Sequence, residues 1–364
     1  MNYSVRQYQP EDEKEIVRLL DEVFNGWPKF DLQCSPLDHW RWKFIDNPPK
    51  ITVVSLAISD GKIIGSTHGL PQKLKIGEQI FLSIQSVDVA THPDFRRMGI
   101  NTELNSLRDV IMKNAAIDFR YAVSSNPILV NSYKRAGAQA LPFTLENLFR
   151  IRDIALHIKM TSKKFSLRKY GLYILKIPNR FKSMKKVSNK LSYDFKITKI
   201  DRFDEKIDEF WSQVRPQYKF VVERDRDYLN WRYCDPRGGN YVIKVAEAEN
   251  KTLGYTVLRI NRYDKEYPVG YIVDLLAPPD RPNVVSELAK AAVEFFDNEN
   301  INEIQVNVLK GSAVESLFHG MGFINNPTKP FMNYSPKYRN DKLDKIYQCD
   351  VNNMHFVYGD HDWI

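Results

Sequence analysis

The first 150 residues alternate between strand-like and helical patterns of hydrophobic and polar positions. A β-rich segment over 4–8 precedes a stretch in which apolar residues recur every three or four positions, at Ile16, Leu19, Leu20 and Val23, as on an amphipathic helix. Two further β-rich segments, 51–58 and 62–70, flank Ser59-Asp60-Gly61, a hairpin signal. The pattern continues with a strand over 79–90, a helix over 99–114, a strand over 119–124 and a short helix over 128–135. We predict a mixed α+β domain.

The second half of the chain repeats the first at an almost constant spacing. Trp42-Lys43-Phe44 resembles Trp231-Arg232-Tyr233, and the strand that contains Asp88 resembles the strand that contains Asp274. The segments that end in Gly65 and Gly137 recur, in the same order, as segments that end in Gly254 and Gly322. We therefore predict two domains of one type, each a mixed, mostly antiparallel twisted sheet flanked by helices.

Charge divides the chain between these domains. Hydrophobic residues make up 43% and charged residues 27% of the 364 residues, which is ordinary globular usage. The net charge is +8, yet 150–190 alone holds thirteen Lys or Arg against one acid, so the rest of the chain is net acidic. We expect a first domain over 1–150, a basic linker over 151–190, a second domain over 191–340 and a C-terminal strand or tail over 341–364.

The basic segment 150–190 has two interpretations. A helical linker with a solvated charged face is favoured, and contact with an anionic membrane surface is the alternative. Nucleic acid is not favoured as a partner, because the basicity is local.

Other features narrow the class of protein. There is no run of eighteen apolar residues, 1–20 carries acids where a signal peptide needs an apolar stretch, and the three cysteines lack paired spacing. We expect a cytoplasmic protein that binds no metal, with peripheral membrane contact as the alternative. A monomer and a dimer are both left open.

The segment 87–102 carries the clearest chemical signal. A strand ends at Ala90, and a loop that begins at Thr91 and contains Arg96 and Arg97 leads into a helix at about Gly99. N–H groups at the start of a helix point outward at the positive end of its dipole, glycine permits close approach, and arginine supplies charge. The arrangement predicts a phosphate-binding loop, and an ordinary helix N-terminus is the alternative.

The loop also resembles a known motif. Arg96-x-x-Gly99-x-Asn101 is similar to the acyl-CoA pyrophosphate motif of the GNAT superfamily of N-acyltransferases, Gln/Arg-x-x-Gly-x-Gly/Ala, and departs from it at Asn101. Asn126, followed by Tyr133-x-x-x-Gly137, resembles the second signature of the superfamily. The resemblance implies acetyl-CoA or another acyl-CoA as the donor, held by Val89, Ala90, Thr91, Arg96, Arg97, Met98, Gly99, Ile100, Asn101, Thr102 and Asn126.

The resemblance also implies catalytic roles. Tyr133 would protonate the leaving thiolate as general acid, with core packing as the alternative. Asp88 is our candidate for the base. Because Asp274 recurs at the matching position of the second half, a structural role for both aspartates is the alternative.

The second half lacks the donor motif. Its loop 277–283 has no glycine, three prolines remove N–H donors, and Phe318 replaces the tyrosine. We expect one acyl-CoA site per chain and a degenerate second half that shapes the acceptor site or stabilises the first. The first half is also similar to the enhanced-intracellular-survival acetyltransferases, in which the chain's terminal carboxylate sits at the active site. For the tail 354–364 we favour a final sheet strand over a base supplied to the first domain.

These features predict an acyl-CoA-dependent N-acyltransferase. We expect it to transfer acetyl from acetyl-CoA to a primary amine of a small molecule or sugar, by direct attack in a ternary complex. The alternatives are an aminoacyl-tRNA-dependent transferase of the tandem-GNAT type and a non-catalytic acyl-CoA-binding scaffold. The acceptor cannot be derived from the fold.

Overall fold

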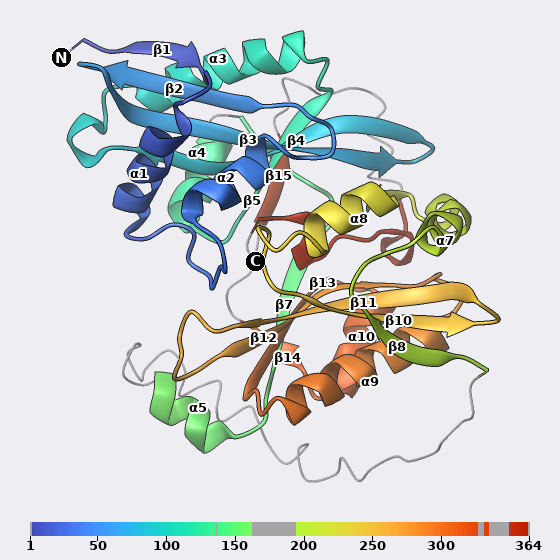
Figure 1. The fold of residues 1–364 in the computed structure, drawn as a ribbon. Coiled ribbons are helices and arrows are strands. Elements are labelled where there is room, and N and C mark those ends of the chain that lie inside the picture. The colour runs from blue at the N-terminus through green and yellow to red at the C-terminus, as the bar shows by residue number, and fades with distance from the viewer. Residues whose placement is uncertain (1, 136, 162–193, 327–330, 335–348, 363–364) are drawn as a thin grey trace.

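Two twisted sheets, each built mostly from one half of the chain, face each other across a layer of helices and loops (Figure 1). The computed structural model describes residues 2–135, 137–161, 194–326, 331–334 and 349–362. The first sheet runs in the order β1 (Ser4–Gln7), β2 (Val53–Ser59), β3 (Lys62–Ile76), β4 (Gln79–Thr91), β5 (Phe119–Ser124), β15 (Phe331–Tyr334) and β6 (Gln139–Ala140), while β9 (Phe220–Val222) pairs with the end of β3.

Helices cover both faces of the first sheet. The amphipathic helix α1 (Glu13–Phe24) buries Ile16, Leu19 and Leu20 in the main core, together with α2 (Pro36–Phe44). On the other face, α3 (Ile100–Asn114) packs Ile100 and Leu104 against β2 and β3 in a separate cluster (Figure 1). The short helices η1 (Pro93–Phe95) and α4 (Pro127–Arg135) follow β4 and β5.

The second sheet runs in the order β14 (Ile324–Asn325), β7 (Leu145–Ile151), β13 (Glu303–Leu309), β12 (Val269–Leu276), β11 (Lys251–Asn261), β10 (Val242–Ala248) and β8 (Lys196–Ile200). Its helices are α5 (Ile154–Thr161), α7 (Lys206–Val214), α8 (Arg226–Tyr233), α9 (Pro282–Asn298) and α10 (Ala313–Gly320), and η3 (Arg215–Gln217) follows α7. Within each sheet one pair is parallel, β4 with β5 and β12 with β13, and the other pairs described are antiparallel. The predicted fold, two mostly antiparallel sheets flanked by helices, is confirmed.

A tryptophan pair joins the two halves of the chain. Trp42 of α2 and Trp231 of α8 stack with ring centroids 4.8 Å apart. Each indole N–H donates to the backbone carbonyl of the other residue, at 3.0 and 3.2 Å. Such reciprocal contacts are characteristic of a self-complementary interface between equivalent surfaces, and the two tryptophans are the ones that the sequence repeat matches.

The sheets exchange strands. β7 lies at the end of the first half in sequence but pairs with β13 and β14 of the second sheet. Conversely, β15 lies between β5 and β6 of the first sheet. Each sheet therefore contains strands from both sides of the expected boundary near 150. Most of the expected linker, residues 162–190, lies outside the described residues.

The C-terminal tail does not form the sheet strand that we favoured. Over 349–362 it forms two short turns, η6 (Val351–Asn353) and η7 (Tyr358–Asp360), and it runs between the two sheets (Figure 1). Residues from both sides hold it: His355 donates its backbone N–H to Phe220, and the backbone carbonyl of Asp360 accepts from Gln72 of β3. The tail is a buried connection between the halves.

Candidate functional site

A wedge opens between the two parallel strands of the first sheet. β4 and β5 pair only where Ser83–Gln85 lies beside Phe119–Tyr121, although β4 continues to Thr91 and β5 to Ser124. Beyond Gln85, no strand of the described residues pairs with this side of β4. Every second residue of β4 directs its backbone N–H and C=O groups to this unpaired side, which is the kind of strand edge to which an extended ligand adds.

A β-bulge in β4 shapes this wedge. Ser66 lies opposite Ala90, whereas His68 lies opposite Val87, so β4 holds one extra residue and Asp88 adopts a left-handed φ of 46°. His68 Nδ1 donates to the backbone carbonyl of Asp88 at 3.0 Å, and its Nε2 accepts from the indole of Trp40 at 3.1 Å. Burial lowers the pKa of His68 to about 4, so a neutral imidazole holds the bulge in place.

The predicted phosphate loop directly follows β4. Arg96, Arg97, Met98 and Gly99 are all exposed, and the chain reaches α3 through left-handed residues at Arg97 (φ 68°) and Gly99 (φ 81°). The N–H groups of Ile100 and Asn101 belong to the first helical turn, where no intrahelical acceptor exists. A Cβ built on Gly99 would meet no atom within 4 Å, so the space over the loop is open.

α4 places two more predicted residues at the carboxyl end of β5. Asn126 immediately precedes α4 and accepts, through its carbonyl, the N–H of Val130. Tyr133 is half-buried, and burial raises its pKa, an effect that Arg108 opposes and that Asp362 reinforces. Tyr133 and the C-terminal tail therefore share one electrostatic environment.

A buried ion cluster lies beside the bulge. The Lys43 ammonium of α2 contacts Asp88 Oδ2 at 2.8 Å and Asp362 Oδ2 at 3.3 Å. The second oxygen of Asp88 accepts from the Trp27 indole at 2.9 Å, and that of Asp362 accepts from the Gln85 amide at 3.2 Å. Three charged groups, from α2, β4 and the tail, thus form one buried cluster.

The two carboxyl groups of this cluster differ in basicity. For Asp88, burial is the largest effect and opposes ionisation, but Lys43, His68 and Trp27 together outweigh it, and the net pKa is lowered. For Asp362, burial is the largest effect and raises the pKa, and the negative charge of Asp88 raises it further. Burial disfavours the charged form of Lys43, but the two carboxylates raise its pKa. Asp362 is therefore the more easily protonated carboxyl.

The matching aspartate of the second half lies in a closed network. Asp274 accepts from Tyr233 (3.0 Å), Tyr255 (3.1 Å) and His355 (3.0 Å), and it pairs with Arg224 at 3.3 Å. Arg224 also binds Asp360 of the tail at 2.7 Å. Both carboxylate oxygens of Asp274 are occupied and the side chain is buried, which gives it a structural role.

Sequence reasoning missed Lys43, Gln85 and the position of Asp362. Lys43 lies inside the repeated tryptophan motif, and a lysine between two core aromatics was a usable signal for a buried charge. Asp362 could not be placed, because its position depends on the path of the tail. Within the described ranges, no group of three or more His, Cys, Asp or Glu residues could hold a metal ion.

Known proteins resemble the chain in part of the sequence and in the whole fold. Residues 4–140 match the family described as acetyltransferase (GNAT) domain. No curated protein sequence matches the chain.

Three solved structures share the fold over most of the chain. N-myristoyltransferase of Saccharomyces cerevisiae with bound myristoyl-CoA has a TM-score of 0.60 and 12% identity, over 94% of this chain and 87% of that one. A GCN5-related N-acetyltransferase from Anabaena variabilis has 0.61 and 11%, over 92% and 72%. A probable N-acyltransferase from Enterococcus faecalis, a conserved protein of unknown function, has 0.59 and 13%, over 95% and 74%. At these identities the likeness concerns the fold.

Proposed function

We propose that this tandem GNAT-superfamily protein transfers an acyl group from acyl-CoA to a primary amine, with its first half as the catalytic domain. The observation that carries the proposal is the wedge between β4 and β5, which opens directly onto an exposed glycine loop at the start of α3. A strand edge beside an anion-binding helix start suits a ligand with an amide-containing arm and a pyrophosphate. The pantetheine and pyrophosphate parts of CoA have this chemistry.

The free edge of β4 and the loop would bind different parts of the acyl-CoA donor. Backbone groups of Val89 and Thr91 would pair with the pantetheine amides, because those of Ala90 point to Ser66 of β3. The N–H groups from Arg97 to Asn101 would bind the pyrophosphate. Gln85 supports a polar ligand at the apex of the wedge: its buried Oε1 has no hydrogen-bond partner among the described residues. We propose acetyl as the acyl group.

The reaction requires two proton transfers. The amine nitrogen attacks the thioester carbonyl carbon, the new C–N bond forms, and the C–S bond breaks with its electron pair on sulfur. The phenol of Tyr133 would give its proton to this thiolate, and its raised pKa keeps it protonated until then. The proton lost by the amine needs a carboxylate nearby.

We propose Asp362 as the group that accepts this proton. Its raised pKa makes it a stronger base than Asp88, and its hydrogen bond from Gln85, at the apex of the wedge, supports this role. Asp88, our candidate from the sequence, would instead hold Lys43 and so position Asp362. The tail would thereby supply the base to the first half.

The acceptor and the cellular setting stay predictions. A small-molecule or sugar amine remains the proposed acceptor, and the second half would shape its site. No helix in the described part of the chain is long and apolar enough to cross a membrane. The membrane-contact alternative rests mainly on residues outside the described ranges.

Release of free thiol from acetyl-CoA, measured with a panel of amines, tests the proposal. Wild-type protein should release thiol only when an acceptor amine is present. Tyr133→Phe should lower kcat about 10²- to 10⁴-fold while acyl-CoA still binds. Tyr263→Phe is the matched control, because Tyr263 is 58% exposed and lies in the second half. Equal turnover in both variants would remove Tyr133 from the mechanism, and an absence of amine-dependent release would contradict the proposed reaction.

A further inference from the structure

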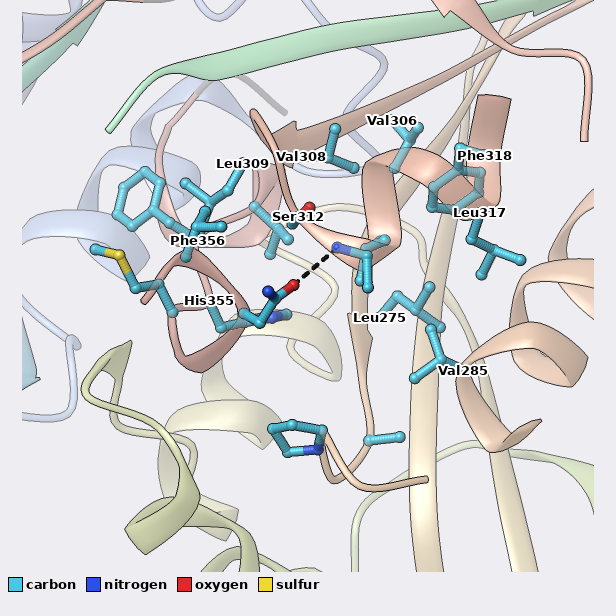
Figure 2. Close-up of a pocket in the computed structure, with 18 of the residues that line it drawn as sticks. Leu275, Val285, Val306, Val308, Leu309, Ser312, Leu317, Phe318, His355 and Phe356 are labelled. Carbon is cyan, nitrogen blue, oxygen red and sulfur yellow. Dashed lines mark hydrogen bonds between the residues drawn. The ribbon is translucent and has the colours of Figure 1, made fainter. Parts of the chain in front are cut away.

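The second half contains a cavity at the position that corresponds to the wedge of the first half. β12 and β13 pair only where Val269–Ile272 lies beside Glu303–Val306, and then separate as β4 and β5 do. A cavity of about 340 Å³ lies where they part, and Figure 2 shows Leu275, Val308 and Leu309 around it, with Val285 of α9 and Phe318 of α10. A volume above about 300 Å³ is typical of small-molecule sites.

Residues from the tail close one side of this cavity. His355 and Phe356 line it in Figure 2, and Asn352 Oδ1 accepts the N–H of Ala313, the first residue of α10, at 2.9 Å. Ser312 Oγ accepts from Glu315 N in the same turn, at 3.1 Å. Two donors of this helix start, the N–H groups of Ala313 and Glu315, are therefore occupied by protein groups.

The chemistry of the lining excludes an anionic ligand. The cavity wall contains no Lys or Arg among the described residues. The loop before α9 carries Pro278, Pro279 and Pro282, none of which has an N–H to offer. A phosphate or carboxylate inside the cavity would lose its hydration without gaining a cation, which is costly. CoA is therefore not the ligand of this site.

One residue that lines the cavity has a buried polar atom without a partner among the described residues. Asn307 of β13 is fully buried and lines the cavity. Its amide nitrogen donates to Asn147 Oδ1 at 2.7 Å, whereas its Oδ1 has no hydrogen-bond partner in the part of the chain that the structure describes. A buried acceptor of this kind is costly unless something donates to it. A ligand hydroxyl or a neutral N–H would meet that need.

We propose that the second half binds an uncharged, mainly aliphatic ligand with one hydrogen-bond donor in this cavity, as a site separate from the acyl-CoA site. The aliphatic wall would bury the hydrocarbon part, and Asn307 Oδ1 would accept the donor hydrogen. The two sites lie on either side of the tail: Phe356 lines the cavity and also packs against Tyr121 of β5, with ring centroids 6.1 Å apart. The duplicated half thus keeps the wedge of its counterpart but binds a different class of molecule.

Titration of the full-length protein with 1-octanol and with octanoate tests this assignment. Octanol should bind with one site per chain, and octanoate should bind at least tenfold more weakly because its carboxylate finds no cation. Val314→Asp places a charge at a half-buried position of the wall and should weaken octanol binding at least tenfold. Val285→Asp, on a different helix, is the second wall variant. Val110→Asp is the matched control, because Val110 is 54% exposed on α3.

Binding of acetyl-CoA to each variant separates this site from the first. The wall variants should keep the acetyl-CoA affinity of the wild type, which also shows that they are folded. Three results would overturn the proposal: no octanol binding, equal octanol affinity in the wall variants and the wild type, or octanol binding that disappears in Gly99→Ala. The last result would place the alkyl chain in the first half.

Discussion

Replacement of Gly99 by alanine separates the cost of backbone strain from the loss of donor binding. Gly99 has φ 81°, and a Cβ there meets no atom within 4 Å. The substitution should therefore cost only the strain of a left-handed alanine, about 1–2 kcal/mol of unfolding free energy. The same Cβ projects into the open space that a pyrophosphate must enter to reach the N–H groups of the loop.

The same substitution should also weaken acetyl-CoA binding, and this effect should be the larger of the two. Losing one hydrogen bond from a backbone N–H to a charged phosphate oxygen costs about 1.5–3 kcal/mol, which raises Kd about 10- to 150-fold. Urea unfolding gives the stability change, and isothermal titration with acetyl-CoA gives Kd.

Two other glycines provide matched controls. Gly61 (φ 74°) and Gly311 (φ 82°) also have no atom within 4 Å of a Cβ, and neither lies in the loop. Alanine at each should cost a similar unfolding free energy and leave Kd unchanged. The reasoning would be refuted if Gly99→Ala bound acetyl-CoA as tightly as Gly61→Ala does.

Two further predictions concern the buried carboxyl groups. Because the pKa of Asp362 is raised, the rate of acyl transfer should fall on acidification at a pH above the ordinary carboxyl value of about 3.9. A pH–rate profile of Asp362→Asn should lose this acid limb and most of the rate. An acid limb that is unchanged in the variant would remove Asp362 as the base. For Asp274, burial is the largest effect and opposes ionisation, but Arg224, His355 and Tyr233 together outweigh it, so its pKa is lowered. Its contribution to stability is therefore present above about pH 3.9 and lost as pH falls through the folded value. Asp274→Asn should cost about 3–5 kcal/mol at neutral pH and less in acid, as measured by urea unfolding, and a loss below 1 kcal/mol would contradict the network described.

The sequence predicted the elements whose signals are local. The amphipathic spacing of 13–24, the turn at Asp60-Gly61 and the loop before α3 are each determined by neighbouring residues, and each appears in the structure. The duplication was also visible, because matched motifs keep their order and spacing. The tryptophan pair that joins the two halves comes from one of these motifs.

Long-range partnerships could not be predicted from local signals. The segment of β7 reads as a strand, but nothing within it specifies that it joins the other half's sheet. The tail is aromatic and strand-like in sequence, yet its hydrogen bonds and ion pairs go to both halves, which favours a buried irregular path. Lys43, Asp88 and Asp362 are separated by up to 319 residues, so their meeting depends on the complete fold.

The number of acetyl-CoA molecules bound per chain tests the central claim most directly. Isothermal titration of the wild type and of Arg96→Ala/Gly99→Pro would measure it. If the first half alone holds the donor, the wild type binds one molecule per chain and the double variant binds none. Two molecules per chain, no binding to the wild type, or undiminished binding to the double variant would contradict the account.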